Sequence, residues 1–141
     1  MAKKQRQDKP SNAKVTIPGN LDHPPEPHEV DAAWILAVHF DCEVEFLKES
    51  KGYMVKTPDI KMRGVFYEIK SPNGKSKSTI SNNLNKAKEQ SRNIILDLRR
   101  LKMSQNDALS EVEQYLSLQR GITRMLVITK DKKVLALKGV S

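Results

Sequence analysis

The sequence contains very little cysteine and no long hydrophobic run. Of its 141 residues only Cys42 is a cysteine, so an internal disulfide and a zinc site built from several cysteines are both excluded. Residues 1–14 are basic, but the apolar stretch of a secretory signal does not follow them. No apolar run approaches the roughly 18 residues that a membrane span needs. These absences predict a cytoplasmic chain, as written, without a membrane span.

Positive charge exceeds negative charge, and the excess is concentrated in one region. The chain has a formal net charge of +8 and a mean hydropathy of −0.59. Residues 56–103 carry twelve Lys/Arg against four Asp/Glu, whereas residues 26–55 carry two against seven. A concentrated positive field favours a polyanion such as nucleic acid, although a solvated basic surface is the simpler alternative.

The length predicts one domain, and the composition divides the chain in two. Residues 1–25 contain Lys, Gln, Asn, Pro and Gly with few apolar groups and end in a proline-rich stretch, so they are expected to form a disordered basic tail. Residues 26–141 are expected to form the folded domain. Its pattern predicts helices over 27–40, 78–93 and 105–119, and strands over 42–47, from 53, and over 64–70, 94–98, 123–129 and 134–137.

This order of elements predicts an α/β fold in three layers, with a central mixed sheet flanked by helices. The strands over 64–70, 94–98 and 123–129 are separated by helices, so they should be parallel or mixed and central. Trp34 falls on the apolar face of the first helix, and a core position is favoured over a base-stacking role.

The stretch PDIKMRGVFYEIK, residues 58–70, contains a pattern that points to chemistry. Side chains alternate along a strand, so Glu68 and Lys70 share one face. A turn that brings Asp59 to the same place would gather two carboxylates and an ammonium. Two carboxylates can hold a Mg²⁺-like cation for phosphodiester hydrolysis, with the backbone carbonyl of Ile69 as a further ligand and Lys70 stabilising charge on the phosphate. The simpler alternative is a surface ion pair between Glu68 and Lys70, with Asp59 as a turn residue.

These residues resemble the PD-(D/E)xK nuclease superfamily, in which a Pro-Asp pair is followed by Glu-x-Lys. The likeness extends over roughly residues 28–137. It includes an acidic residue on the preceding helix (Glu29), the strand VEFL, Gly64, a Ser/Lys/Asn-rich loop and helix, Gln90 and the strand NIILDL. This longer pattern is similar to the C-terminal tRNA-nuclease domains of CdiA contact-dependent inhibition toxins and to related phage or mobile-element proteins.

The resemblance implies a restriction-endonuclease-like fold and metal-dependent endonucleolytic cleavage of RNA, with tRNA as the favoured substrate. Asp59, Glu68 and Lys70 would form the catalytic centre with Glu29 as an auxiliary acid, and the metal would be Mg²⁺, or Mn²⁺ or Zn²⁺. A first-turn acid that stabilises the helix dipole is the other interpretation of Glu29. His28 and His39 are expected to be ordinary surface or helix-end histidines.

Several residues are candidate contacts to the nucleic acid. A helix N-terminus near Ser78 can bind an anion, and basic side chains around it can bind phosphates. Gln90 would lie near the metal site or on a solvated helix face. The predicted contacts are Lys75, Lys77, Ser78, Gln90, Arg99, Arg100 and Lys102.

Three other functions are compatible with the sequence: a DNA endonuclease on the same scaffold, a non-catalytic nucleic-acid-binding protein, and a metal-independent ribonuclease. If the domain is a toxin, an acidic immunity protein is expected to face the basic segment 70–102. The short chain with its own Met1 shows no delivery segment, which argues against intercellular delivery, while a phage or mobile-element origin remains compatible.

Overall fold

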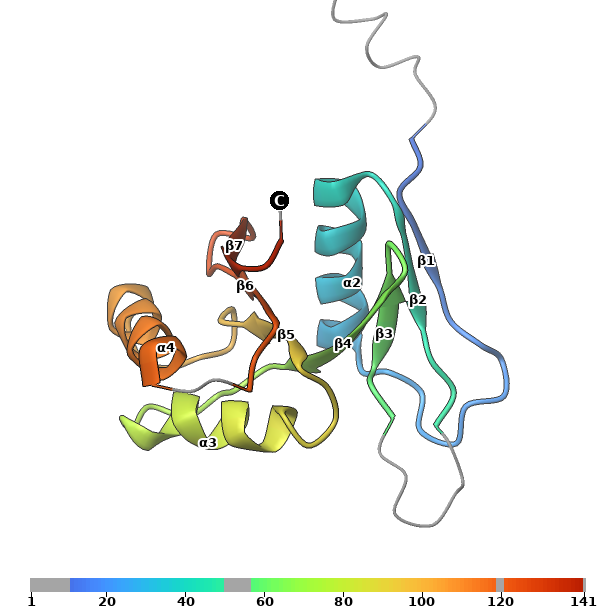
Figure 1. The fold of residues 1–141 in the computed structure, drawn as a ribbon. Coiled ribbons are helices and arrows are strands. Elements are labelled where there is room, and N and C mark those ends of the chain that lie inside the picture. Colours follow the sequence, from blue (N-terminus) through green and yellow to red (C-terminus); the bar gives the residue numbers. More distant parts are fainter. Residues whose placement is uncertain (1–10, 50–56, 119–120, 141) are drawn as a thin grey trace, which may run out of the picture.

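A computed structural model describes residues 11–49, 57–118 and 121–140 of the chain. Three helices accompany seven strands in these ranges (Figure 1). The helices are α2 (Pro27–Phe40), α3 (Ser78–Ala87) and α4 (Gln105–Leu118). The strands are β1 (Lys14–Thr16), β2 (Glu43–Phe46), β3 (Ile60–Met62), β4 (Val65–Lys70), β5 (Asn93–Asp97), β6 (Arg124–Ile128) and β7 (Val134–Lys138).

The strands form one seven-stranded mixed sheet in the order β1-β2-β3-β4-β5-β6-β7. β4, β5 and β6 are parallel neighbours at its centre, while β3 and β7 run antiparallel to their neighbours. The predicted α/β class and the central parallel strands are therefore confirmed. No helix in the described ranges is long and apolar enough to cross a membrane.

Two hydrophobic cores lie on opposite faces of the sheet. Helix α2 packs with β2, β3 and β4 around residues such as Leu36, Ile60 and Ile69. Helices α3 and α4 pack on the other face around residues such as Leu84 and Leu96. Consecutive residues of β5 point to opposite cores, so helices cover both faces at this strand and make three layers (Figure 1).

Helix α2 begins and ends where its sequence predicts. Pro27 occupies the first turn, and the N-cap residue Glu26 exchanges hydrogen bonds with Glu29 in a capping box. Asp41 ends the helix in the left-handed conformation, with φ of 50°. The expectation for Trp34 was wrong, because its side chain is 45% exposed. The apolar residues of α2 are distributed around the whole helix, so periodicity alone could not show which face is buried.

Three other predictions need correction. Residues 14–16 of the expected disordered tail form β1, because they pair in parallel with β2 and Val15 packs against the core under α2. Strand β3 was missed because only three residues, one of them the exposed Lys61, make it up. Helix α3 ends at Ala87, well before the predicted residue 93. The strand predicted from residue 53 lies almost entirely outside the described residues.

Candidate active site

The candidate site lies where strand β4 changes its hydrogen-bonding partner. Residues Val65 to Tyr67 pair with β3, whereas residues Glu68 to Lys70 pair with β5. Strand β3 begins at Ile60, opposite Tyr67, so it provides no partner for the next part of β4. The β3 side of β4 is therefore open at the position of Glu68.

Asp59 occupies this opening. Its backbone N–H donates to the carbonyl of Tyr67 at 3.0 Å, and its Oδ2 accepts a hydrogen bond from the backbone N–H of Ile69 at 2.8 Å. The carboxylate thus replaces the missing strand as the partner of β4. This contact places Asp59 beside the Glu-Ile-Lys segment, as the sequence pattern predicted.

Glu68 is buried and only partly paired. It is 5% exposed, and its Oε2 lies 3.5 Å from Nζ of Lys70. Its Oε1 is buried and has no hydrogen-bond partner among the described residues. Both oxygens of an exposed carboxylate would contact water, so the alternative of an exposed surface ion pair is excluded for Glu68.

Both carboxyl groups have a raised pKa, and desolvation by burial is the main cause for each. Burial raises the pKa of Glu68 to about 8, the nearby Asp59 carboxylate adds to the rise, and the Lys70 ammonium opposes it. Burial also raises the pKa of Asp59, although hydrogen bonds from Ile69 and Glu68 oppose the shift and the charge of Glu29 adds to it. A bound cation would relieve this repulsion.

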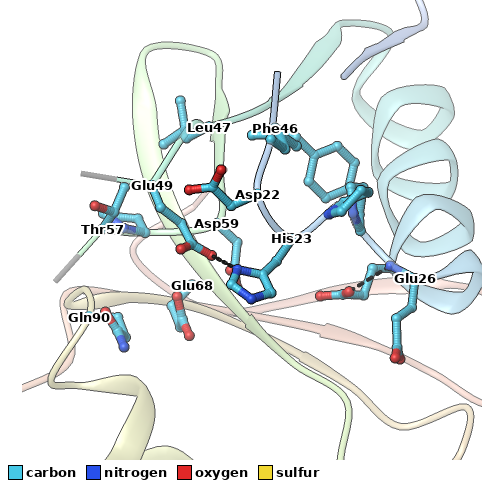
Figure 2. A pocket seen from close by; sticks show the side chains of 15 residues that line it. Asp22, His23, Glu26, Phe46, Leu47, Glu49, Thr57, Asp59, Glu68 and Gln90 are labelled. Atoms are coloured by element: carbon cyan, nitrogen blue, oxygen red, sulfur yellow. Dashed lines mark hydrogen bonds and ion pairs between the residues drawn. The ribbon is translucent and has the colours of Figure 1, made fainter. Parts of the chain in front are cut away.

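Both carboxyl groups open into a cavity of about 720 Å³ (Figure 2). Its described lining contains no Lys or Arg, and six of its side chains are acidic: Asp22, Glu26, Glu29, Glu49, Asp59 and Glu68. Gln90 lies beside Glu68, and an ion pair of 3.7 Å joins His23 to Glu49 (Figure 2). The cavity is therefore strongly anionic.

Sequence analysis missed part of this wall because it treated residues 1–25 as a disordered tail. Asp22 and His23 reach the cavity because β1 fixes the preceding segment on β2. Glu49 follows β2 and lies on the same wall. No local periodicity marks these three residues, so only the long-range strand pairing could have revealed them.

Glu29 has two roles in the structure. Its Oε1 accepts a hydrogen bond of 2.8 Å from the backbone N–H of Glu26, and its side chain also lines the cavity. Glu26, His28 and Glu29 lie close enough to hold a metal ion. However, His28 already contacts Glu26 at 3.5 Å and Arg100 at 2.8 Å. We therefore explain this cluster by helix capping and local pairing.

Four predicted phosphate contacts gather on two neighbouring loops, and we call Lys75, Lys77, Arg100 and Lys102 the basic rim. All four residues are exposed. The backbone N–H of Lys102 donates to the carbonyl of Gly74 at 3.0 Å, which joins the loop after β4 to the loop after β5. The basic rim therefore lies beyond the carboxyl ends of the parallel strands that carry Lys70 and Asp97. Ser78, also exposed, begins α3 next to this rim.

Arg99 has a structural role that the sequence pattern did not predict. Its guanidinium contacts the fully buried Asp97 at 2.7 and 2.9 Å and donates to the carbonyl of His28 at 2.7 Å. Asp97 also accepts a hydrogen bond from Ser71, the residue after Lys70. We therefore correct its assignment as a phosphate contact: Arg99 links the end of β5 to the start of α2.

Comparisons with known proteins agree with this architecture. The family model described as contact-dependent growth inhibition CdiA C-terminal domain matches residues 56–134, which include Asp59, Glu68, Lys70 and the basic rim. A chain in the structure of a CdiA-CT/CdiI toxin and immunity complex from Burkholderia pseudomallei has a similar fold, with a TM-score of 0.67 and 18% identity. The alignment covers 89% of the present chain and 98% of that chain. No curated protein matches the sequence.

Proposed function

The chain belongs to the family of contact-dependent growth inhibition CdiA C-terminal domains, and on this premise we propose that it is a divalent-metal-dependent endonuclease of the PD-(D/E)xK type. Its proposed substrate is RNA, with tRNA preferred. The observation that carries the proposal is that Glu68, whose Oε1 is buried and has no partner among the described residues, lines a cavity with Asp59 and contacts Lys70.

The donor set fits a hard divalent cation. Asp59 and Glu68 offer carboxylate oxygens, which suit Mg²⁺ or Mn²⁺ better than Zn²⁺. Glu29 supplies a third carboxylate on the same cavity, and the carbonyl of Ile69 is a further proposed ligand. When bound, the cation would offset the negative charge of the site, polarise the scissile phosphate and assist ionisation of the attacking water.

Residues of the chain would orient the carboxylate of Asp59 and stabilise the charge that develops on the phosphate. The N–H of Ile69 holds Asp59 in a fixed orientation. Hydrolysis replaces one P–O ester bond with a bond to the oxygen of water, and negative charge develops on the phosphate. Lys70, which is held at Glu68, can stabilise that charge, while Gln90 can donate to a phosphate oxygen or to the attacking water.

The charge distribution supports a polyanionic substrate. The basic rim can bind phosphates on either side of the scissile bond, while the acidic cavity excludes the backbone until a cation neutralises it. The separation of the basic rim from the acidic cavity therefore favours binding of the nucleic acid to the metal-loaded protein.

Cleavage assays test the proposal directly. Purified protein incubated with Mg²⁺ should cut tRNA, and EDTA should stop the reaction; duplex DNA serves as the alternative substrate. Glu68→Gln and Asp59→Asn should abolish cleavage but keep tRNA binding. Glu113→Gln, which changes an exposed acid on α4, is the matched control and should cut normally. Cleavage that survives EDTA or Glu68→Gln would indicate a metal-independent ribonuclease, and binding without any cleavage would indicate a non-catalytic protein.

The family also supports a role as a growth-inhibiting toxin with an immunity partner. The chain of similar fold occurs in a toxin and immunity complex. The partner proposed here is an acidic protein that covers the basic rim. Expression in a bacterial host should stop growth for the wild type and not for Glu68→Gln. A pulldown from the native host that recovers no acidic partner would contradict the second part of this proposal.

A further inference from the structure

An exposed aromatic ring lies on the strand that carries the candidate catalytic residues. Phe66 of β4 is 47% exposed, although β4 is at the centre of the sheet. Tyr67 and Ile69 point into the core under α2, so Phe66 points to the opposite face with Glu68 and Lys70. Phe66 does not belong to the core under α3 and α4, so about half of the residue remains exposed.

A lysine accompanies the ring. Lys61 on β3 is the direct cross-strand partner of Phe66, and its Nζ lies over the ring, 5.6 Å from the ring centroid. Lys61 is itself exposed. A half-exposed aromatic ring with an ammonium over it can stack a planar base on its exposed part, while the ammonium contacts the phosphate attached to that base. Glu45 on β2 is the cross-strand partner of Lys61 on the side away from Phe66, and its negative charge makes that side of Lys61 unfavourable for a phosphate.

The backbone of Phe66 is also connected to the cavity through the turn between α3 and β5. Ser91 and Asn93 both donate hydrogen bonds to the backbone carbonyl of Phe66, at 3.2 and 3.0 Å. The preceding residue, Gln90, lines the cavity beside Glu68. Along β4 itself, the positions of Phe66 and Glu68 are about 7 Å apart. This distance is short enough for a single nucleotide to bridge.

We propose that Phe66 and Lys61 form a stacking platform for one unpaired nucleobase next to the scissile phosphate. The inference rests on the proposed function and adds a substrate preference to it. Bases within a duplex cover each other's faces, whereas an unpaired base can place its face on an aromatic ring. The platform therefore selects single-stranded segments or loops over regular duplex.

Binding measurements in the Glu68→Gln background test the platform independently of cleavage. A fluorescein-labelled single-stranded RNA oligonucleotide and its duplex form are the probes, and fluorescence anisotropy gives the Kd in the presence of Mg²⁺. Phe66→Ala and Phe66→Leu should weaken single-strand binding roughly tenfold or more, because each removes base stacking. Phe66→Trp should retain the affinity, and duplex binding should change little.

Trp34 provides a matched control, because it is 45% exposed and lies on α2, which covers the opposite face of the sheet. Trp34→Ala should leave single-strand affinity unchanged. In a Trp34→Phe, Phe66→Trp double variant, the indole at residue 66 should be quenched when the oligonucleotide binds. Thermal unfolding of each variant will show that the fold is retained.

The outcomes separate this inference from the proposed function. If Phe66→Leu binds the single strand as well as the parent protein does, or weakens single strand and duplex equally, the platform is refuted even when the wild type cleaves RNA. A loss of affinity limited to a protein partner would assign the ring to a protein interface and would also refute it. Quenching at residue 66 without cleavage by the wild type would support the platform and contradict the nuclease.

Discussion

Replacing Glu68 by Gln should change how the stability of the protein depends on pH. The pKa of Glu68 rises from 4.5 to about 8 in the folded chain, mainly because the group is buried. Between these two values the folded state holds a proton that the unfolded state has released. Ionisation therefore favours unfolding, and the penalty begins near the lower value, grows with rising pH and is complete near the upper value.

The size of the effect follows from the same shift. Each pH unit in this window removes about 1.4 kcal/mol from the free energy of unfolding. A rise from about pH 5.5 to about pH 7.5 should therefore cost the wild type about 3 kcal/mol, or about 10 °C in Tm for a domain of this size. Glu68→Gln has no proton to release, so this contribution should be absent from its pH profile.

Urea unfolding in EDTA across this pH range measures the difference between the two proteins. Glu68→Gln should match the wild type within about 1 kcal/mol at low pH and exceed it increasingly as the pH rises. Asp59 is present in both proteins, so its titration contributes to both pH profiles. The control Glu113→Gln should show the same pH dependence of stability as the wild type. Added Mg²⁺ should stabilise the wild type at high pH and should have a smaller effect on Glu68→Gln. A difference between wild type and Glu68→Gln that does not vary with pH would refute the assignment of Glu68 as a desolvated acid.

Two further experiments test structural and binding roles. Arg99→Ala should lower the free energy of unfolding, measured in urea, by about 3–5 kcal/mol, because Asp97 would remain buried without its partner. Arg100 is exposed, so Arg100→Ala should lower the free energy of unfolding by less than about 1 kcal/mol. Equal losses for the two variants would contradict the assignment of Arg99 as a structural residue. Neutralising Lys75 and Lys77 together by Gln should weaken tRNA binding and reduce the slope of log K against log salt by about 1.5, and an unchanged slope in a salt titration would remove these residues from the binding surface.

The elements that sequence patterns predicted are those with strong local signals. Helix α2 has Pro27 at its start, and β4 has alternating faces with apolar residues. The convergence of Asp59 with Glu68 was also predictable, because the short Pro-Asp and Glu-x-Lys pattern occurs together with strands and helices in the expected order. Their catalytic roles and the metal remain predictions.

The errors occurred where tertiary contacts outweighed local sequence. Strands β1 and β3 each have three residues and are stable only because neighbouring strands supply their hydrogen bonds. Trp34 belongs to a helix with apolar residues on every side, so its exposure depends on where the sheet lies. Arg99 could not be distinguished from Arg100 by sequence, because only the folded chain places the first against the buried Asp97.

The geometry at the start of β3 distinguishes a functional site from a structural one. The open edge of β4 requires one hydrogen-bond acceptor for the N–H of Ile69, and an uncharged Asn could supply it as well as Asp59 does. That requirement does not explain Glu68, whose carboxyl group is buried beside the carboxyl group of Asp59 and has an oxygen without a partner among the described residues. An apolar residue at the same position would avoid the desolvation cost and the repulsion between the carboxylates. The pair is stable in its charged form only when positive charge enters the cavity, and Lys70 supplies only part of that charge. A divalent cation supplies the remainder, and for this reason the metal dependence of stability at high pH is as direct a test of the site as cleavage itself.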